Sequence, residues 1–388
     1  GRSVPAVRVA DPRASDVPHV QDVQGARDRA ARDVSSAVTV ALDAMGSDRG
    51  AEVIVAGARD AVAHGDLRVL VCGPSDVLGP LVEGVPEIEV VHAPGLISQN
   101  DEPARAARER GDSSVVTCMR LVREGRAQAA VSAGPTGAVL AAGLLELRRL
   151  PGVLRPAIVQ PLPSWKGPIV VLDIGATPDP RPNQLHQFAH MGSAFSASVL
   201  GVHEPRVGLL SNGHEEGKGN RLVIDSYRLL ADDDRLIFAG NIEGRDVPLG
   251  AVDVVVTDGF TGNVVLKLLE GTGAWLFDEI RQAATSSWQG KLGGLLLRPK
   301  LRPLRDKVNP DTYGGSYLIG LRAIAVKAHG DSGAVAISNA LRHAARGVRE
   351  GLIEDIGRRV RPEPVPAALD DAADRDTQIS PASADQGQ

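Results

Sequence analysis

The segment of residues 252–270, VDVVVTDGFTGNVVLKLLE, combines an apolar run with residue types that could bind an anion. Val252–Thr257 is β-branched and apolar, which is typical of a buried strand in a parallel sheet. From Val264 onward, apolar residues recur with the spacing of one helical face. The turn between them holds Asp258, Gly259, Thr261, Gly262 and Asn263. Because such a turn aims free N–H groups and the positive end of the helix dipole at one point, we expect a phosphate site here. The alternative is an ordinary connection whose glycines only make the turn and whose Asn263 only caps the helix.

Lys218 is the single cation best suited to contact a phosphate or a developing oxyanion. It lies between Gly217 and Gly219 in a loop that follows the apolar run 206–210. A flexible ammonium in such a loop can reach a charged ligand, although a solvated loop lysine is an equal alternative. His214 and His329 could act as acid–base groups, but loop histidines are more often merely exposed. The sequence is not a P-loop, since the leading glycine is missing and Gly219 replaces the Ser or Thr that binds magnesium.

Loops of similar composition follow other predicted strands. They are residues 43–48, 132–137, 173–177 and 211–220, which are rich in Gly, Asp, Asn, Ser and Thr. Each loop alone is a weak signal, because short connections need small residues anyway. Ligands bind outside the carboxyl ends of parallel strands, so we expect these loops to line one cleft at equivalent ends of one sheet. The carboxylates Asp43, Asp48, Asp173 and Asp179 are expected to cap helices or orient loop amides rather than to hold a metal.

The elements that must position these loops alternate along the chain. Strands are predicted at 38–42, 67–72, 88–92, 129–132, 169–173, 206–210, 236–239 and 252–257. Helices are predicted at 51–64, 113–124, 138–149 and 183–200, among other gaps. This alternation indicates βαβ units and a largely parallel sheet covered on both faces.

Composition limits the classes of function. The 388 residues are 43% hydrophobic with a net charge of −5, so a substantial core is expected and a nucleic-acid binder is not. Cys72 and Cys118 lack partners at metal-ligand spacing and are expected to be buried thiols in a reducing compartment. No apolar run is long enough to span a membrane and no apolar signal segment begins the chain, so we expect a cytoplasmic protein. Residues 1–37 and 361–388 are expected to be a disordered leader and tail around one domain, residues 38–360.

The stretch 288–307, WQGKLGGLLLRPKLRPLRDK, concentrates leucines and cations in a chain that is acidic overall. Such a segment suits an anionic lipid surface or an acidic protein partner. The alternative is a helical hairpin, about 280–312, buried in a dimer interface. The residues predicted to contact the membrane or partner are Leu292, Leu295, Leu296, Leu297, Arg298 and Lys300.

These loops belong to an ordered set of motifs: DAMGxD (43–48), SAGxTGA (132–138), LDxGA (172–176), QFAxMGS (187–193), GLL…E-x-KGN (208–220), GNIEGRD (240–246), TDGFTGNVVLK (257–267), YGG (313–315) and KAHG (327–330). Together the motifs resemble the bacterial acyl-ACP:phosphate acyltransferase family, PlsX. It implies a Rossmann-like α/β/α sandwich like isopropylmalate dehydrogenase and phosphotransacetylase, with a mostly parallel sheet and a protruding helical hairpin. It also implies a homodimer that transfers a fatty acyl group from acyl carrier protein to inorganic phosphate, without a metal or organic cofactor. The acyl phosphate would serve phospholipid synthesis, with a membrane glycerol-3-phosphate acyltransferase as a further partner and peripheral membrane association.

The resemblance also implies the site residues. Lys218 and Asn263 would contact the reacting groups. The residues expected to bind phosphate or substrate are Asp43, Gly46, Ser132, Gly134, Thr136, Gly137, Asp173, Gly175, Asp179, Gly213, Asn220, Asn241, Arg245, Asp258, Gly259, Thr261, Gly262 and His329. The sequence departs from the family at Ser47, Pro135, Thr177 and the 211–214 run. Pro135 removes an amide side chain and a backbone donor from the expected cleft.

Other functions remain open at this stage. A phosphotransacetylase-like enzyme that uses acyl-CoA would share the fold and the reaction type. A phosphate- or lipid-binding homologue without turnover is the non-enzymatic alternative. A nicotinamide-dependent dehydrogenase is disfavoured because no dinucleotide fingerprint follows the first strand.

Overall fold

The computed structural model describes residues 37–63, 66–308 and 314–360, without the side chains of residues 303–308. The predicted tail and all but the last residue of the predicted leader lie outside the described residues. So do Tyr313 and the side chains of Arg305 and Lys307. No helix in the described part of the chain is long and apolar enough to cross a membrane.

Eleven strands form one sheet in the order β3-β2-β1-β4-β11-β10-β5-β6-β9-β7-β8. Their bounds are β1 Val38–Asp43, β2 Leu67–Gly73, β3 Ile88–His92, β4 Ala129–Ser132, β5 Ala157–Ser164, β6 Gly167–Leu172, β7 Arg206–Leu210, β8 Ile237–Ile242, β9 Val254–Val256, β10 Ser316–Ile319 and β11 Ile324–Lys327. Each predicted strand is present within a few residues. The strands β5, β10 and β11 were not predicted, because β5 contains Pro161 and Pro163 and the other two are only four residues long.

The two halves of the sheet run in opposite directions. The strands β3, β2, β1, β4 and β11 are parallel to one another, and so are β6, β9, β7 and β8. Between these half-sheets, β10 and β5 pair antiparallel with each other and with their outer neighbours. The expectation that the loops lie at equivalent ends of one parallel sheet is therefore wrong, because the loops after β1 and β4 and those after β6 and β7 belong to opposed half-sheets.

The strand register nevertheless brings both sets of carboxyl ends to one level. Lys327, the last residue of β11, pairs with Ser316, the first residue of β10. The next residue, Tyr317, pairs with Val159 in β5, and Val159 pairs with Leu172, the last residue of β6. One half-sheet thus ends where the other ends, and the loops that follow them face each other.

Helices cover both faces of the sheet, which confirms the predicted α/β/α sandwich. One face carries α1 Ala51–Val62, α2 Ser75–Val82, α6 Pro182–Leu200, α7 Arg221–Ala231, α11 Ala334–Arg349 and α12 Leu352–Arg359. The other carries α3 Pro103–Glu109, α4 Ser114–Arg123, α5 Thr136–Glu146 and the base of α8 Gly259–Thr285. Strand alternation builds the two cores: in β1, Val40 and Leu42 pack on the first face and Ala41 on the second.

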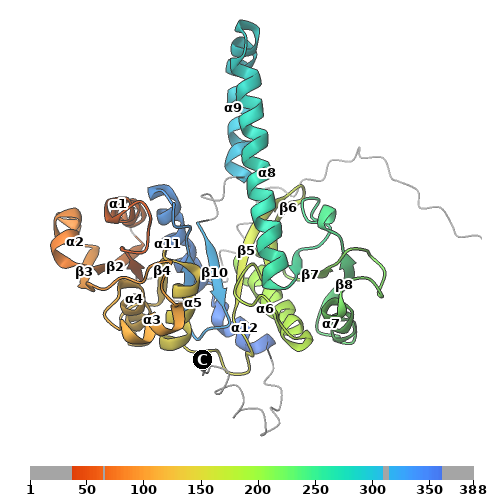
Figure 1. Cartoon of the computed structure of the whole chain (residues 1–388), viewed down its shortest axis with the longest axis horizontal. Helices are drawn as coiled ribbons and strands as arrows, with labels where there is room; N and C mark the ends of the chain where they lie inside the picture. The colour runs from red at the N-terminus through yellow and green to blue at the C-terminus, as the bar shows by residue number, and fades with distance from the viewer. Residues whose placement is uncertain (1–36, 64–65, 309–313, 361–388) are drawn as a thin grey trace, which may run out of the picture. The chain divides into compact units, whose positions relative to one another are not determined.

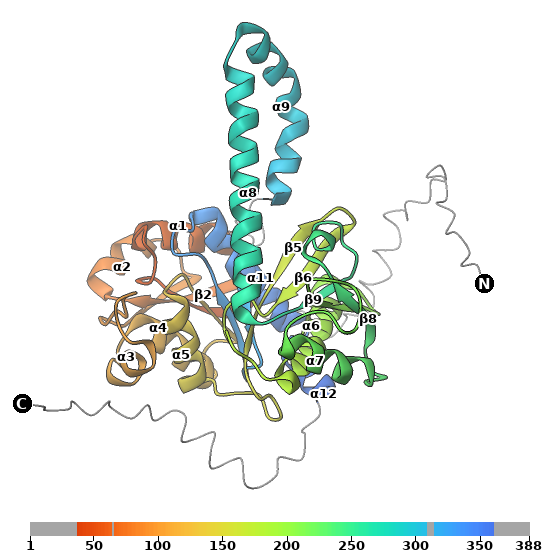
Figure 2. The same cartoon turned by 45° about the vertical axis from the view of Figure 1, so that its right-hand side comes forward.

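The helices α8 and α9 (Trp288–Val308) pack against each other and extend away from the sheet (Figures 1 and 2). The predicted hairpin, about 280–312, covers the turn and α9. Its first helix, however, begins at Gly259, directly after β9, so the hairpin is rooted in one of the predicted site loops. The described leucines of α9 that were predicted to contact a partner are all exposed.

Candidate functional site

A cavity of about 370 Å³ lies where the carboxyl ends of the two half-sheets meet. Its lining comes from the start of α5, the start of β10, the end of β11, β5, the loop after β6 and the first turns of α8. These residues are Thr136, Ile158, Ile174, Gly175, Pro178, Gly259, Phe260, Asn263, Leu266, Lys267, Ser316, Lys327, Ala328 and His329. The structure therefore brings together several of the predicted site residues, with apolar and cationic side chains in one space.

Behind the cavity, a buried hydrogen-bond network ties the loops after β1 and β4 together. The Ser132 hydroxyl donates to the Asp43 carboxylate over 2.6 Å and accepts from the N–H of Gly134 over 3.0 Å. A Cβ on Gly46 would lie 2.6 Å from the Cα of Gly134, so only glycine fits there. Asp43, Gly46, Ser132 and Gly134 were predicted to bind the ligand; the structure places them as supports of the loops, outside the cavity lining.

The N-terminus of α5 provides free backbone donors at the cavity. Thr136 lines the cavity, and the neighbouring Gly137 packs so closely on Pro103 that an added Cβ would lie 2.7 Å from its ring. Within the described residues, the N–H groups of Thr136, Gly137 and Ala138 have no acceptor. Pro135 fills the N-cap position without a side-chain hydrogen bond. An anion in the cavity would meet these donors and the positive end of the helix dipole.

Asp173 organises the loop after β6 from a fully buried position. Its carboxylate accepts hydrogen bonds from the N–H groups of Ile158 (2.8 Å), Gly175 (3.2 Å), Ala176 (3.1 Å) and Thr177 (2.6 Å). Burial raises the pKa of Asp173 to about 6, so the carboxylate is ionised at neutral pH. The backbone donors of this loop are thus engaged by the protein's own carboxylate, which makes Asp173 a positioning residue.

The N-terminus of α8, the predicted backbone anion site, is largely occupied by acceptors of the chain itself. Asp258 is the N-cap: its carboxylate accepts from the N–H of Thr261 over 2.8 Å and from its hydroxyl over 2.7 Å. The N–H of Gly259 donates to the Thr177 carbonyl over 2.9 Å, and that of Gly262 donates to the Asp258 carbonyl. A Cβ on Gly262 would lie 1.9 Å from the Asp173 carbonyl oxygen. Here the glycines serve the close approach of α8 to the loop after β6.

Asn263 lies in the second turn of α8 and lines the cavity, so it does not cap the helix. Lys267 follows four residues later on the same face and also lines the cavity. Its ammonium lies 2.8 Å from the carboxylate of Glu270, and the same carboxylate lies 3.6 Å from Nε2 of His329. Burial lowers the pKa of His329, so this imidazole is neutral at physiological pH.

Lys327 is the most buried cation at the cavity. It ends β11, and burial together with the neighbouring Lys267 lowers its pKa to about 8. The site therefore brings two cationic side chains, Lys327 and the Glu270-paired Lys267, to one space with the N-terminus of α5 and the amide of Asn263. This arrangement can bind a dianion and donate hydrogen bonds to a developing oxyanion.

Sequence reasoning gave no role to Lys267 or Lys327, although both stand in motifs that carry the resemblance. A signal existed for each. Lys267 comes four residues after Asn263, on the same face of the predicted helix. Lys327 directly follows the apolar run Ile324–Val326 and precedes the glycine-bearing loop 328–330. Without β11 among the predicted strands, that second signal had no strand end to belong to.

Lys218 lies outside the cavity lining, in the exposed part of the loop after β7. A Cβ on Gly213 would lie 2.8 Å from the Lys218 Cγ, so the loop packs on the lysine stem. The loop is anchored by Asn241, whose amide donates to the Glu215 carbonyl over 2.8 Å. Asn220 caps α7 by accepting from a backbone N–H over 3.0 Å. These predicted ligand residues form a second region, separate from the cavity lining.

The remaining predicted residues also lie outside the cavity lining. Arg245, in the short 3-10 helix η2 (Gly244–Asp246), pairs with Glu243 over 3.0 Å and is 71% exposed. His214 lies 2.8 Å from the Asp246 carboxylate, and Asp179 is exposed.

Comparison with known proteins agrees with the fold and adds a family. The model of the family described as "Fatty acid synthesis protein" matches residues 38–355. A phosphate acyltransferase of Thermobifida fusca is 48% identical over 307 residues, covering 78% of this chain and 85% of that protein. A phosphate acyltransferase of Anoxybacillus flavithermus is 42% identical over 324 residues, covering 83% and 97%.

Solved structures with the same fold are much more distant in sequence. The EutD phosphotransacetylase from Staphylococcus aureus is similar with a TM-score of 0.52 at 18% identity, over 80% of this chain and 94% of that one. A phosphotransacetylase from Streptococcus pyogenes is similar with a TM-score of 0.53 at 16% identity, over 85% and 99%. These likenesses confirm the predicted Rossmann-like architecture.

Proposed function

The chain belongs to the fatty acid synthesis protein family, that of the PlsX phosphate acyltransferases, and from this premise we propose how it works as an acyltransferase. The donor is a fatty acyl thioester of acyl carrier protein, the acceptor is inorganic phosphate, and the product is an acyl phosphate. The reaction takes place in the cavity between the two half-sheets. The observation that supports this placement is the convergence of Lys267, Lys327 and the free N–H groups of α5 on one space.

The chemistry needs placement and charge stabilisation more than a strong base. An oxygen of hydrogen phosphate attacks the thioester carbonyl carbon and a tetrahedral oxyanion forms. When the C–S bond breaks, the carrier sulfur leaves as a thiolate and takes up the proton that the phosphate gives up, so the products are the acyl phosphate and the carrier thiol. The two lysines and the α5 N-terminus hold the phosphate and offset its charge. The Asn263 amide donates to the oxyanion. No step requires a group beyond these side chains and the two substrates.

Apolar residues in the cavity lining suit the acyl chain. Ile158, Ile174 and Leu266 line the cavity beside the cations. At its edge, Phe260 is 68% exposed and begins a stripe on α8 that continues through Val264 and Leu268. A fatty acyl group entering along this stripe would place its thioester next to the phosphate.

The basic face of α9 supports a carrier protein as the donor. Lys291, Arg298, Lys300 and Arg302 belong to this helix, and the first three are exposed together with Leu295. An acidic carrier would be attracted to this face, whereas a soluble coenzyme A ester needs no such surface.

The hairpin also supports a homodimer and peripheral membrane association. The exposed Trp275, Leu276 and Trp288 on α8 and α9 could be covered by a second copy or by lipid. Changing Leu295, Leu296 and Leu297 to Ser should release the protein from anionic vesicles and leave turnover in solution largely intact. If the triple variant instead becomes monomeric or inactive, the leucines belong to the subunit interface and the membrane proposal is wrong.

The proposed function is tested with purified protein, a long-chain acyl-ACP and phosphate, trapping acyl phosphate with hydroxylamine. We expect phosphate-dependent loss of acyl-ACP, with the matching acyl-CoA a much poorer donor. Equal use of acyl-CoA would favour a phosphotransacetylase-like enzyme. Consumption of neither donor would leave a phosphate- or lipid-binding protein without turnover.

A further inference from the structure

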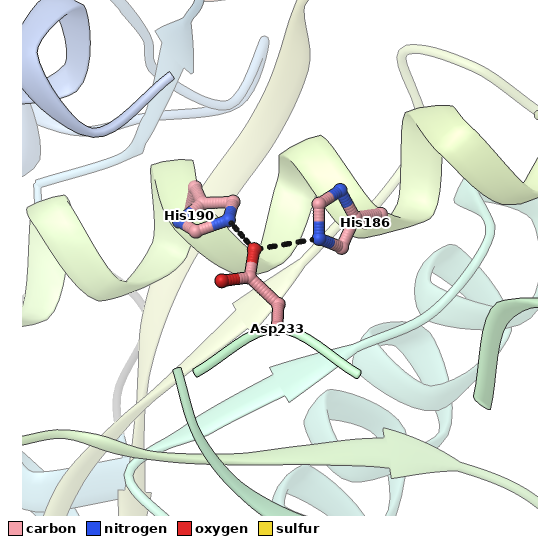
Figure 3. Close-up of side chains that lie close together, drawn as sticks. All are labelled: His186, His190 and Asp233. Atoms are coloured by element: carbon pink, nitrogen blue, oxygen red, sulfur yellow. Dashed lines mark hydrogen bonds and ion pairs between the residues drawn. The ribbon is translucent and has the colours of Figure 1, made fainter. Parts of the chain in front are cut away.

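A cluster of potential metal ligands lies on the face of the sheet covered by α6. His186 and His190 are four residues apart on one side of α6, and Asp233 comes from the connection between α7 and β8 (Figure 3). One ligand atom from each residue lies within 4.8 Å of the others. This is the one such group among the described residues. None of the three residues lines the cavity described above.

The contacts within the cluster converge on a single carboxylate oxygen. Nε2 of His186 lies 2.8 Å and Nε2 of His190 lies 2.7 Å from Oδ2 of Asp233. The side chains of His190 and Asp233 are only 5% and 8% exposed. Two imidazoles on one helical face with a carboxylate opposite are a ligand set that zinc and similar ions prefer.

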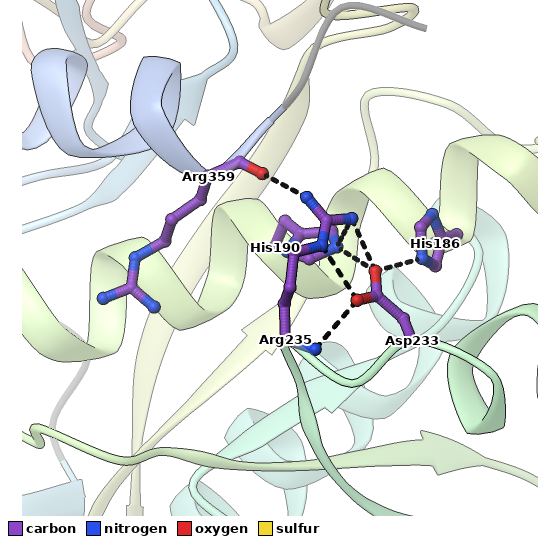
Figure 4. Close-up of polar contacts among 5 residues, drawn as sticks. All are labelled: His186, His190, Asp233, Arg235 and Arg359. Atoms are coloured by element: carbon purple, nitrogen blue, oxygen red, sulfur yellow. Dashed lines mark hydrogen bonds and ion pairs between the residues drawn. The ribbon is translucent and has the colours of Figure 1, made fainter.

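Arg235 occupies the place where a cation would be expected. Its Nη2 lies 2.6 Å from Oδ2 of Asp233 and 3.0 Å from Nε2 of His190 (Figure 4). A carboxylate only accepts and a guanidinium only donates, so one state of the His190 nitrogen cannot satisfy both neighbours. When this nitrogen carries a proton, its N–H meets the N–H of the guanidinium. When it carries none, its lone pair meets the carboxylate oxygen. A cation that binds both the carboxylate and the imidazole lone pair in place of the guanidinium removes this conflict.

We propose that His186, His190 and Asp233 bind a divalent transition-metal ion of the zinc class, which displaces the Arg235 guanidinium from the Asp233 carboxylate. Tetrahedral zinc ligands lie about 3.3 Å apart, so the carboxylate needs to withdraw by only about half an ångström from each imidazole. The Arg235 side chain is 33% exposed, so on displacement it would turn into solvent and give up its contacts to Oδ1 of Asp233 (2.9 Å) and to the Arg359 carbonyl (3.3 Å).

A groove reaches the carboxylate side of the site. The groove, about 410 Å³, lies between α7 and β8 and is lined by Asp233 together with Asp234, Tyr227 and Phe238. Three protein ligands leave one tetrahedral position for water. The bound ion would join α6 to the connection between α7 and β8, so its expected effect is stabilisation of this half of the domain rather than chemistry in the cavity.

The test uses the full chain, freed of metal with a chelator and titrated calorimetrically with Zn²⁺, with Co²⁺ as a spectroscopic probe. We expect one ion per chain, a tetrahedral Co²⁺ absorption spectrum and a rise in Tm with added Zn²⁺. His186→Gln and His190→Gln should each weaken binding by about 100-fold or more, the upper end of the cost of losing even an outer-shell partner. The matched control is His203→Gln, an exposed histidine beyond the end of α6, which should bind as the unaltered protein does.

Arg235→Gln keeps the test decisive even if a histidine variant folds poorly. If the guanidinium competes with the ion, this variant should bind Zn²⁺ about tenfold more tightly, because the competing cation is gone. Weaker or unchanged binding in Arg235→Gln would overturn the proposal, as would equal Zn²⁺ binding by the two histidine variants and the control. Either result would leave the cluster as an internal salt-bridge network.

Discussion

The loop at residues 211–220 and the cavity wall formed by β11 and α8 both place lysines beside glycine-bearing backbone, but in different surroundings. Lys218 is exposed and lies outside the cavity lining. Lys327 is half-buried at the end of a central strand, where desolvation and the neighbouring Lys267 lower its pKa to about 8. The difference shows that neighbouring glycines alone do not place a lysine in the cavity. The position of the strand end that carries a lysine, and the other elements that meet there, determine whether the lysine faces a cavity or solvent.

The largest effect on turnover is expected from substitution of Lys327. Lys327→Met should lower turnover by about 100- to 1000-fold, the usual cost of one charge contact to a transition state. The variant should remain folded, because methionine is apolar and similar in length. Steady-state acyl phosphate formation measures the loss. Lys166→Met, in the exposed turn between β5 and β6, is the matched control and should retain normal turnover.

Asn263 tests the oxyanion contact in the cavity wall. Asn263→Ala should lower kcat by about 100-fold, the lower end of the usual cost of losing one oxyanion donor. It should leave thermal stability nearly unchanged, because Asp258 and not Asn263 caps α8. Asp258→Ala should instead cost about 1 kcal/mol of unfolding free energy. A reversal of these two stability effects, measured by denaturant titration, would contradict the capping assignment.

The pH dependence of phosphate binding tests the role of Lys327. Lys327 is charged below its pKa of about 8 and neutral above it, so the KM for phosphate should rise as the pH passes upward through about 8. The Lys327→Met variant should lose this rise. If the KM for phosphate of the unaltered protein does not change between pH 7 and 9, Lys327 does not bind the phosphate.

The smallest effect is expected from the exposed loop. The resemblance to the family implies that Lys218 contacts the reacting groups, and loss of such a contact in Lys218→Ala would lower turnover by about two to three orders of magnitude. The cavity geometry predicts a loss of about tenfold or less, because an exposed charge outside the cavity is screened by solvent. Turnover assays of this variant distinguish the two expectations, and a 1000-fold loss would move the reacting groups toward the 211–220 loop.

Much of the fold could be predicted because its local signals are strong. The β-branched runs such as Val252–Val256 and the helical periodicity of α6 predict their elements directly. The two opposed half-sheets could not be predicted, because they depend on β5, β10 and β11, whose short or proline-containing segments carry little periodicity. Local pattern does not contain the register that aligns Lys327 with Leu172 through two antiparallel strands.

The lining of the cavity could be predicted only in part, for the same reason. Thr136, Gly175, Gly259, Asn263 and His329 were expected and line the cavity. Asp43, Asp173 and Asp258 were expected to touch the ligand, but polar side chains at strand ends also serve to hold loops, and their hydrogen bonds show that they do. Sequence composition cannot separate a carboxylate that faces a ligand from one that faces its own backbone.

The most direct test of the account is the KM for phosphate in Lys327→Met and Lys218→Ala, measured side by side with saturating acyl-ACP. If the cavity between the half-sheets binds phosphate, Lys327→Met should raise this KM by about 30-fold or more while Lys218→Ala changes it by about threefold or less. The opposite order, with Lys218→Ala raising the KM and Lys327→Met leaving it unchanged, would contradict the placement of the phosphate in this cavity.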